Sequence, residues 1–486
     1  MNSLGPSFTT EVMPTPVPEP SWVAQNFKLG QDLGLPDEWL NGAEGLAVFS
    51  GNGLWEGMQA RASVYSGHQF GQWAGQLGDG RALSLGEFAS PKGTVEIQLK
   101  GAGKTPFSRM GDGRAVLRSS IREYLCSEAM AGLGIPTTRA LCLTGSPLPV
   151  LREELETAAI VTRTAPSFIR FGHFEHFAND ASPNGIEHLK QLADFVIAHH
   201  FEAQDFSSAN PYATLLEKVS VRTAHLMAQW QAVGFCHGVM NTDNMSILGL
   251  TLDYGPFQFL DGFNPRHICN HSDSMGRYAY DRQPQVAYWN LFCLAQALMP
   301  LIEEQDLAMK ALEPYKSAFA ESWEIGFLNK LGIAKQQDPA LASDDKTLLN
   351  DLLQLLANEQ VDFTIFWRRL SHAAPSTQAA SSEWQSVADV FIDQSAWGEW
   401  RDRYLSRLQK SPADMAVRQM LQVNPKFVLR NHLAEAAIQK SKKGDHSEVD
   451  TLFKLLQSPF EEHLQFEHYA NLPPDWAANI EISCSS

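Results

Sequence analysis

The stretch of sequence that decides how the chain is interpreted is His237-Gly238-Val239-Met240-Asn241-Thr242-Asp243-Asn244, followed nine residues later by Asp253-Tyr254-Gly255. Two carboxylates and a carboxamide stand close together here, at Asp243, Asn244 and Asp253. Their oxygen atoms are the ligands that Mg²⁺ and similar cations prefer. The same residue types are also common in turns, so an ordinary loop between two strands remains the alternative.

The spacing of this stretch matches the catalytic segment of protein kinases, H-R-D-x-x-x-x-N followed by D-F-G. His237 falls on the His, Asn244 on the metal-binding Asn, and Asp253 on the Asp of the D-F-G triplet. Val239 stands at the position of the catalytic Asp and cannot accept a proton, whereas Asp243 directly precedes the metal-binding Asn. We therefore expect a metal-bound nucleotide here, handled differently from the nucleotide of an ordinary kinase.

Composition limits the classes of protein to consider. The chain has 486 residues, more than one hydrophobic core usually serves, so we expect two or more lobes. Its formal net charge of −17 argues against a nucleic-acid partner but not against ATP. The six cysteines are scattered, which favours a reducing compartment over a disulfide scaffold or a zinc site. We see no secretory signal and no membrane span, and expect a cytoplasmic protein.

A Gly-rich segment, residues 65–81, precedes two alternating stretches that predict an antiparallel hairpin over 81–87 and 94–100. Glycines at such density, among them Gly78 and Gly80, let a backbone approach phosphate closely, and Arg81 adds a positive charge. Lys100 ends the second strand, where a kinase-like fold places its phosphate-binding lysine. The alternatives are a surface loop with turn glycines and a solvated lysine at a strand end.

Residues 115–133 have the spacing of a helix that follows a turn with a possible N-cap at Asp112. Glu123 lies in the middle of this helix, where a kinase-like fold pairs a glutamate with the strand lysine. Glu128 is a rival that lies nearer the end of the helix. Earlier in the chain, the apolar run 46–49 suggests a short strand.

Three further strands are predicted over 138–144, 149–154 and 158–163, followed by Arg163 and Arg170 on either side of a Pro-broken segment. Arginine binds phosphate oxygens bidentately and keeps its charge when buried, so both are candidates for binding a triphosphate. Salt bridges to the many carboxylates of this chain are the alternative.

From Gly185 onward the pattern changes to long helices, over 186–201, 212–233 and 285–302, and the remainder is helical to about residue 470. The elements follow one another in the order found in kinases: the Gly-rich hairpin, the strand with Lys100, the helix with Glu123, further strands, helices and the metal-binding loop. This order predicts an α+β, bilobal, kinase-like fold. We expect an extended arm over 1–25, a β-rich N-lobe over 26–170, a helical C-lobe over 171–470, and a tail over 471–486.

At this level the chain resembles the selenoprotein O family, the bacterial YdiU-type protein adenylyltransferases. The segments that carry the resemblance, over nearly the whole chain, are Gly67-His-Gln-Phe-Gly71, Gly78-Asp-Gly-Arg81, Leu99-Lys-Gly-Ala-Gly103, Arg109-Met-Gly-Asp-Gly-Arg114, Arg163-Thr-Ala-Pro-Ser167, Asn241-Thr-Asp-Asn244 and Asp253-Tyr-Gly255.

The resemblance implies an enzyme that binds ATP flipped relative to kinases and transfers AMP to Ser, Thr or Tyr hydroxyls of proteins, releasing pyrophosphate. It implies Asp243 as the proton acceptor and Asn244 and Asp253 as ligands of Mg²⁺ or Mn²⁺. The implied nucleotide contacts are Gly78, Gly80, Arg81, Lys100, Asp112, Gly113, Arg163, Arg170 and Asp253. Some bacterial relatives are linked to UMP transfer from UTP. An ordinary phosphotransferase and a nucleotide-binding pseudokinase scaffold remain the competing functions.

Cys484 stands third from the end, a place that resembles the one occupied by selenocysteine in eukaryotic relatives. A mobile tail thiol there could form a regulatory disulfide with Cys269, which lies in the equivalent of the activation segment. The alternative is a free, exposed thiol in a reducing cytoplasm.

Overall fold

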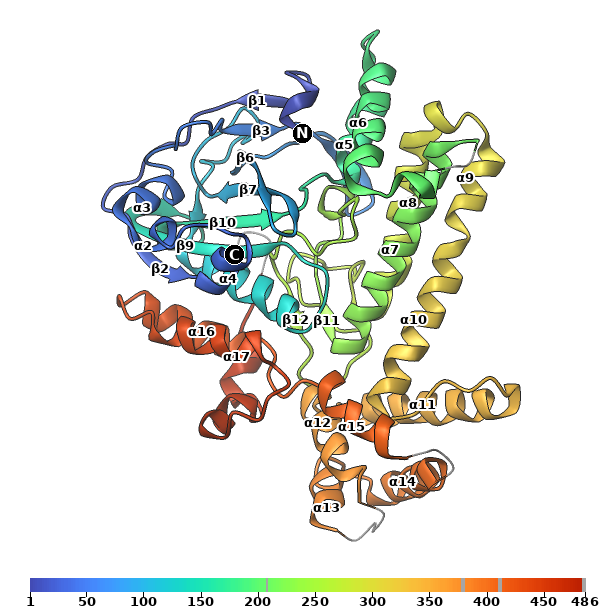
Figure 1. Cartoon of the computed structure of the whole chain (residues 1–486). Helices are drawn as coiled ribbons and strands as arrows, with labels where there is room; N and C mark the ends of the chain where they lie inside the picture. The colour runs from blue at the N-terminus through green and yellow to red at the C-terminus, as the bar shows by residue number, and fades with distance from the viewer. Residues whose placement is uncertain (207–208, 377–380, 410–412, 483–486) are drawn as a thin grey trace.

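The structure is a computed structural model that describes residues 1–206, 209–376, 381–409 and 413–482 (Figure 1). Strands dominate the first third of the chain and helices the rest, so the expected α+β class is confirmed. The main sheet is antiparallel. Its strands in sheet order are β1 (Thr9–Glu11), β3 (Arg61–Ser63), β6 (Ala82–Ser90), β7 (Gly93–Lys100), β10 (Leu155–Ala165), β9 (Arg139–Leu151) and β2 (Ser21–Gln25), and β8 (Ala115–Val116) pairs with β10.

The predicted hairpin over residues 81–100 is confirmed as β6 and β7, paired from Ala82 opposite Lys100 to Ser90 opposite Gly93. Lys100 is also paired with Val161 of β10 on its other side. The lysine that ends β7 is therefore held in the middle of the sheet, between two neighbouring strands.

The first 25 residues, expected as an extended arm, begin with a short 3-10 helix, η1 (Asn2–Leu4), and contribute two strands to the sheet. β1 pairs with β3 at one edge, and β2 pairs with β9 at the other. The strand expected over 46–49 is wrong, because these residues end helix α3 (Ala43–Phe49). Four apolar residues are too few for periodicity to distinguish a strand from a helix, and α3 buries Val48 and Phe49 in the core under the sheet.

Two of the strands expected after the central helix are one strand. β9 continues from Arg139 to Leu151 through Pro147 and Pro149. Both prolines come after Gly145, the last residue that β9 pairs with β2, so a missing N–H breaks no bond to that strand. The predicted helix over 115–133 is confirmed as α4 (Leu117–Gly132). It begins two residues late because Ala115 and Val116 form β8 with β10.

Helices α7 and α8 pack against each other in the helical part (Figure 1), and the segment that joins them in sequence contains the motif Asn241–Asn244. The remaining helices are α1 (Phe27–Asp32), α2 (Glu38–Asn41), α5 (Phe171–Ala178), α6 (Gly185–His200), α7 (Pro211–Val233), α8 (Gln283–Ile302), α9 (Gln305–Leu312), α10 (Pro314–Lys330), α11 (Pro339–Glu359), α12 (Phe363–Ala373), α13 (Ser382–Ala388), α14 (Gln394–Gln409), α15 (Ala413–Val423), α16 (Asn431–Ser441) and α17 (Ser447–Gln457).

The last helices fold back onto the first part of the chain. Both α16 and α17 pack against α4, and the Arg122 guanidinium of α4 donates to Asn431 Oδ1 at 3.1 Å. One hydrophobic core therefore includes side chains of α4, α7, α8, α16 and α17. The segment Tyr280–Ile302 is long and apolar enough to cross a membrane, but 56% of its apolar window is buried inside the protein. Since α8 packs on α5 and α7, it is a core helix.

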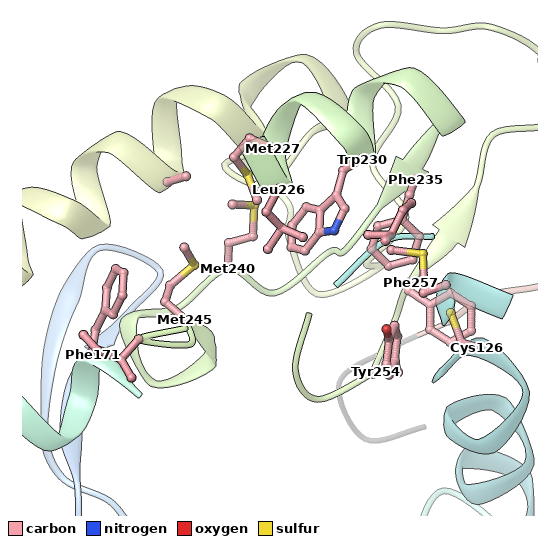
Figure 2. Close-up of a cluster of buried hydrophobic side chains, with 14 of the residues drawn as sticks. Cys126, Phe171, Leu226, Met227, Trp230, Phe235, Met240, Met245, Tyr254 and Phe257 are labelled. Atoms are coloured by element: carbon pink, nitrogen blue, oxygen red, sulfur yellow. The ribbon is translucent and has the colours of Figure 1, made fainter. Parts of the chain in front are cut away.

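A dense cluster of apolar side chains holds both ends of the loop that contains Asn241–Asn244. Figure 2 shows Trp230 of α7 with Phe235 and Phe257 on one side, and Met240 and Met245 on the other. All five side chains are buried in the same hydrophobic core. The polar residues between these anchors are thereby held in place by packing on both sides.

Candidate functional site

His237 anchors the loop as a neutral side chain. Its Nε2 lies 2.8 Å from the carbonyl oxygen of Leu252, its Nδ1 accepts from the Val239 N–H at 3.3 Å, and its ring stacks on Trp230. Burial lowers the pKa of His237, so the imidazole stays uncharged. His237 therefore ties residues 237–239 to the segment just before Asp253.

Asp243 lies in the short helical turn η3 (Thr242–Asn244) with its carboxylate largely desolvated. Gln69 Nε2 donates to Oδ2 at 3.2 Å, while Oδ1 is buried without a hydrogen-bond partner among the described residues. Burial raises the pKa of Asp243 to about 6, although the charge of Arg170 opposes this shift. A carboxylate with such a pKa is suited to accept a proton near neutral pH.

Asn244 follows in the same turn, and its Nδ2 donates to the carbonyl oxygen of Val239 at 2.9 Å. With the amide nitrogen engaged in this way, the amide oxygen is the atom left to act as a ligand. The loop thus presents an amide oxygen directly beside the carboxylate of Asp243.

Asp253 stands in the left-handed backbone region, with φ of 56°, and is surrounded by cations. Its Oδ1 lies 2.6 Å from Arg163 NH1 and 3.5 Å from Lys100 Nζ, and its Oδ2 accepts from Arg170. Burial alone would raise the pKa of Asp253, but the charges of Arg170 and Lys100 hold it well below its usual range. Asp253 is therefore ionised, and the strained backbone is held by these contacts.

Glu123 of α4 completes this group of ion pairs. Its Oε2 lies 2.5 Å from Lys100 Nζ and its Oε1 lies 2.9 Å from Arg163 NH1. Burial lowers the pKa of Lys100, while the charges of Glu123 and Asp253 oppose that shift. The rival Glu128 lies elsewhere, because its carboxylate pairs with Arg139 at 2.7 Å. The structure thus brings together Lys100, Glu123, Arg163, Arg170 and Asp253, which we call the cationic cluster.

The Gly-rich turn before β6 is packed against residues 105–108. Gly78 has φ of 139°, and a Cβ atom there would lie 2.4 Å from Cγ of Phe107. A Cβ on Gly80 would lie 3.0 Å from the carbonyl oxygen of Phe107. Arg81 is exposed, and its charge contributes to lowering the pKa of Lys100, so it stands beside the cationic cluster.

Asp112 and Gly113 lie in the turn before β8. Asp112 accepts two hydrogen bonds from Arg152, at 2.8 and 2.9 Å, which lower its pKa. Gly113 has φ of 70°, and a Cβ atom there would lie 2.1 Å from the carbonyl oxygen of Gly103. Both residues thus pack in the turn after Gly103, and their expected contact with the nucleotide stays a prediction.

Three contacting residues were not singled out by sequence reasoning. Gln69 donates to Asp243, Gln98 accepts from Arg163, and the ring of Tyr65 lies 5.3 Å from the guanidinium carbon of Arg170. Gln69 and Tyr65 belong to the Gly-rich segment, and Gln98 lies two residues before Lys100. Their position in the sequence, close to these motifs, is the signal that could have identified them as site residues.

Cys269 is buried, and its Sγ lies 2.8 Å from the carbonyl oxygen of Pro256. Burial raises the pKa of this thiol well above its usual range. Cys484, its expected partner, lies outside the described residues. The described chain end comes close, because the His271 N–H donates to the carbonyl oxygen of Ile482 at 2.9 Å.

The chemistry of these side chains would suit an anion and a metal ion. In the cationic cluster, three cations share two carboxylates, so one positive charge is left for an anionic ligand to neutralise. An amide oxygen and an ionised carboxylate, at Asn244 and Asp253, are oxygen donors of the kind that Mg²⁺ and Mn²⁺ bind. A carboxylate offers about four acceptor positions, so Asp253 can bind a metal and still accept from an arginine.

Comparison with known proteins agrees with this chemistry. Residues 1–457 match the family described as protein adenylyltransferase SelO. A protein of Albidiferax ferrireducens named protein nucleotidyltransferase YdiU is 60% identical over 99% of this chain and 95% of its own length. Proteins of the same name from Variovorax paradoxus and Ralstonia nicotianae are 57% identical over 100% of this chain and 96% of theirs, and 54% identical over 99% and 94%. The chain therefore belongs to the SelO family and is a protein nucleotidyltransferase.

Proposed function

We propose that the protein transfers AMP from ATP to Ser, Thr or Tyr hydroxyls of other proteins and releases pyrophosphate. The observation that carries this proposal is the position of the only carboxylate in the loop 237–244. Val239 stands where a kinase has its base, whereas Asp243 is four residues further on, buried beside Asn244, with a pKa of about 6. Because the base lies at a different position from the base of a kinase, the reacting phosphorus is expected to be the α-phosphorus rather than the γ-phosphorus.

The depth of Arg163 and Arg170 supports a flipped ATP. Both side chains are almost fully buried, at 1% and 2% exposure. Together with Lys100 they would bind the β- and γ-phosphates inside the cationic cluster, because buried arginines need an anion of matching charge. The α-phosphate would then lie further out, where the incoming hydroxyl reaches it.

Asn244 and Asp253 are the residues that would hold Mg²⁺ or Mn²⁺. Their oxygen atoms fit such an ion, and the ion supplies charge stabilisation for the triphosphate. In the unliganded arrangement both Asp253 oxygens accept from arginines. We expect these arginines to turn partly towards the phosphates when the nucleotide binds, because phosphate then replaces the carboxylate as their partner.

The residues of this chain would act as follows. Asp243 accepts the proton of the substrate hydroxyl, and the hydroxyl oxygen forms a bond to the α-phosphorus. The bond between that phosphorus and the bridging oxygen breaks, and pyrophosphate leaves with the electron pair. Lys100, Arg163 and Arg170 stabilise the charge that develops on the leaving group. Glu123 keeps the Lys100 ammonium directed at the phosphates.

This function fits a kinase-like arrangement with the nucleotide between a β-rich lobe, residues 26–170, and a helical lobe, residues 171–470. Residues 1–25 and 471–486 would be the arm and the tail. We place the protein in the cytoplasm, since Cys126, Cys142, Cys236, Cys269 and Cys293 are free and buried, as in proteins of reducing compartments.

The test is to incubate the protein and a candidate protein substrate with Mg²⁺ or Mn²⁺ and ATP labelled at either the α- or the γ-phosphorus. Label from the α position on protein is expected. Label from the γ position would indicate an ordinary phosphotransferase, and no label with measurable ATP binding would indicate a scaffold. A parallel incubation with α-labelled UTP separates AMP transfer from UMP transfer. Asp253→Ala is expected to abolish the α-label.

A further inference from the structure

Three side chains that can bind a metal converge where the Gly-rich segment meets α5 and α8, at a place the proposed reaction does not use. They are His68 of β4 (Ser66–Gln69), Glu175 of α5 and Cys293 of α8. One ligand atom from each lies within 4.8 Å of the others. His68 Nδ1 and Glu175 Oε1 are 2.5 Å apart. We call this group the His-Glu-Cys cluster.

A second observation points to a missing ligand. The Glu175 side chain is only 2% exposed, and its Oε2 is buried without a hydrogen-bond partner among the described residues. Burial raises the pKa of Glu175, and a hydrogen bond with the Thr242 side chain opposes this shift without pairing Oε2. Burying an unpaired carboxylate oxygen is costly, so such atoms in native proteins usually have a ligand. The His68 ring is also held from two sides, by Trp73 and Trp289, and is thus already oriented.

We propose that the His-Glu-Cys cluster binds one Zn²⁺ ion. An imidazole nitrogen, a carboxylate oxygen and a thiolate are typical zinc ligands, and three protein ligands leave a fourth position for water. Carboxylate and thiolate together neutralise the charge of Zn²⁺, and the thiol proton is released to solvent on binding. A thiolate ligand disfavours Mg²⁺, so this site is distinct from the one at Asn244 and Asp253.

The geometry requires a small adjustment. Ligand atoms around tetrahedral zinc lie about 3.3–3.8 Å apart, given bond lengths of about 2.0–2.3 Å. His68 Nδ1 and Glu175 Oε1, which lie 2.5 Å apart, would therefore separate by about 1 Å, and Cys293 Sγ would approach them by at most about 1 Å, within the reach of rotamer changes on three separate elements. Burial raises the pKa of Cys293 to about 12, so the unliganded residue is a thiol that a bound metal must deprotonate. Arg277, which lies over Trp289 at 4.6 Å, partly opposes that shift, but its positive charge also opposes a cation. The two anionic ligands outweigh this single charge.

The spacing of cysteines along the chain did not suggest zinc, because the ligands come from three distant segments. In the fold, a metal here would join the β4–β5 hairpin (β5, Gln72–Gln76) to α5 and α8. His68 N–H donates to Thr242 Oγ1 at 2.7 Å, and the neighbouring Gln69 donates to Asp243. Zinc would thus join these elements and would position Gln69 against Asp243.

The test is a titration of the reduced, chelator-treated full-length protein with Co²⁺ alone, followed by displacement with Zn²⁺. We expect one equivalent of Co²⁺ to give a thiolate-to-cobalt charge-transfer band in the near ultraviolet, and one equivalent of Zn²⁺ to abolish it. Zn²⁺ should also raise the thermal midpoint of the wild-type protein. If the wild-type protein gives no such band and no shift with Zn²⁺, the proposal is wrong.

Variants assign the ligands. Cys293→Ser should abolish the charge-transfer band, and His68→Ala and Glu175→Gln should weaken Zn²⁺ binding at least about tenfold. Cys142→Ser, at a buried cysteine of β9 outside the cluster, is the matched thiol control and should leave the band intact. Asp253→Asn should also leave it intact, because Asp253 belongs to the nucleotide site. A band that persists in Cys293→Ser would place the metal elsewhere and overturn the assignment.

Discussion

Arg163 and Asp253 form a buried ion pair in which NH1 of the guanidinium lies 2.6 Å from Oδ1 of the carboxylate. The same nitrogen is 2.9 Å from Glu123 Oε1, so one arginine of β10 joins the helix α4 to the proposed metal loop. Burial and the two carboxylates act in opposite directions on Arg163, and its pKa is raised overall. The site is therefore charged and preorganised before any nucleotide binds.

Replacing this arginine should destabilise the fold as well as the site. Arg163→Met leaves Glu123 and Asp253 short of a buried partner, for which we expect a loss of about 3–5 kcal/mol in the free energy of unfolding. Urea unfolding of the wild-type protein and of Arg163→Met measures this loss of stability. Arg152→Met is the matched control, because Arg152 pairs with the partly exposed Asp112 and should cost about 0–1 kcal/mol. Equal losses in both variants would contradict the importance of the buried pair.

The pH dependence of transfer should report Asp243. A base must be ionised to accept a proton, and burial raises the pKa of Asp243 to about 6. Activity measured as kcat/KM for the protein substrate should therefore fall as the pH drops through about 6, and level off above it. Asp243→Asn should lower kcat by a factor of about 10²–10⁴ and remove this acid limb, while nucleotide binding is kept. Full activity in Asp243→Asn would refute its role as the base.

The same pKa predicts the sign of a stability change. Folding raises the pKa of this carboxyl group, so its ionised form lowers the stability of the folded protein, fully so above pH 6. Below the pKa of the unfolded state both states hold the proton, and the group has no effect on stability. Asp243→Asn should thus stabilise the unliganded protein at pH 7.5, by at most about 3 kcal/mol for a shift of two pKa units. The gain should shrink towards pH 4.5. Urea unfolding at both pH values measures it, and a destabilised variant at pH 7.5 would contradict the prediction.

The local patterns predicted most of the elements that form the site. Alternation predicted the hairpin that ends at Lys100, and helical spacing placed Glu123 in α4, where it contacts that lysine. The sequence could not predict that Arg163 contacts both Gln98 and Asp253. These contacts depend on how β7, β10 and the loop with Asp253 meet in space.

The sequence failed to predict other features, each for its own physical reason. The run 46–49 is too short for its period to be determined, and packing under the sheet made it helical. The helix cap expected at Asp112 is wrong, because α4 begins after Val116 without a side-chain cap and Asp112 pairs with Arg152 from a later turn. The His-Glu-Cys cluster joins segments that are far apart in the chain, so no local motif could indicate it.

Gly78 should be intolerant of a side chain. Its φ of 139° is unfavourable for other residues, and an added Cβ would lie 2.4 Å from Phe107 Cγ. We expect Gly78→Ala to destabilise the protein by about 1–3 kcal/mol and to weaken ATP binding, measured by unfolding and by calorimetry. Gly75→Ala is the control, since it has φ of 73° but nothing within 4 Å of the added atom. The double variant Gly78→Ala/Phe107→Ala should recover part of the loss, and no recovery would show that contact with Phe107 is not the cause.

The tail is expected to regulate the enzyme through Cys269 and Cys484. The described end of the chain is bound near Cys269, because His271 N–H donates to the Ile482 carbonyl oxygen at 2.9 Å. Burial raises the pKa of Cys269, so its thiolate is scarce and disulfide formation should be slow and faster at higher pH.

Thiol trapping with and without oxidant measures this reaction. Oxidation should remove two free thiols and change transfer activity, and Cys269→Ala and Cys484→Ser should each prevent both effects. Cys126→Ser, at a buried cysteine of α4, is the matched control and should leave the loss of two thiols unchanged. If the oxidised wild-type protein retains all six thiols, Cys484 is a free thiol and the tail does not act through a disulfide with Cys269.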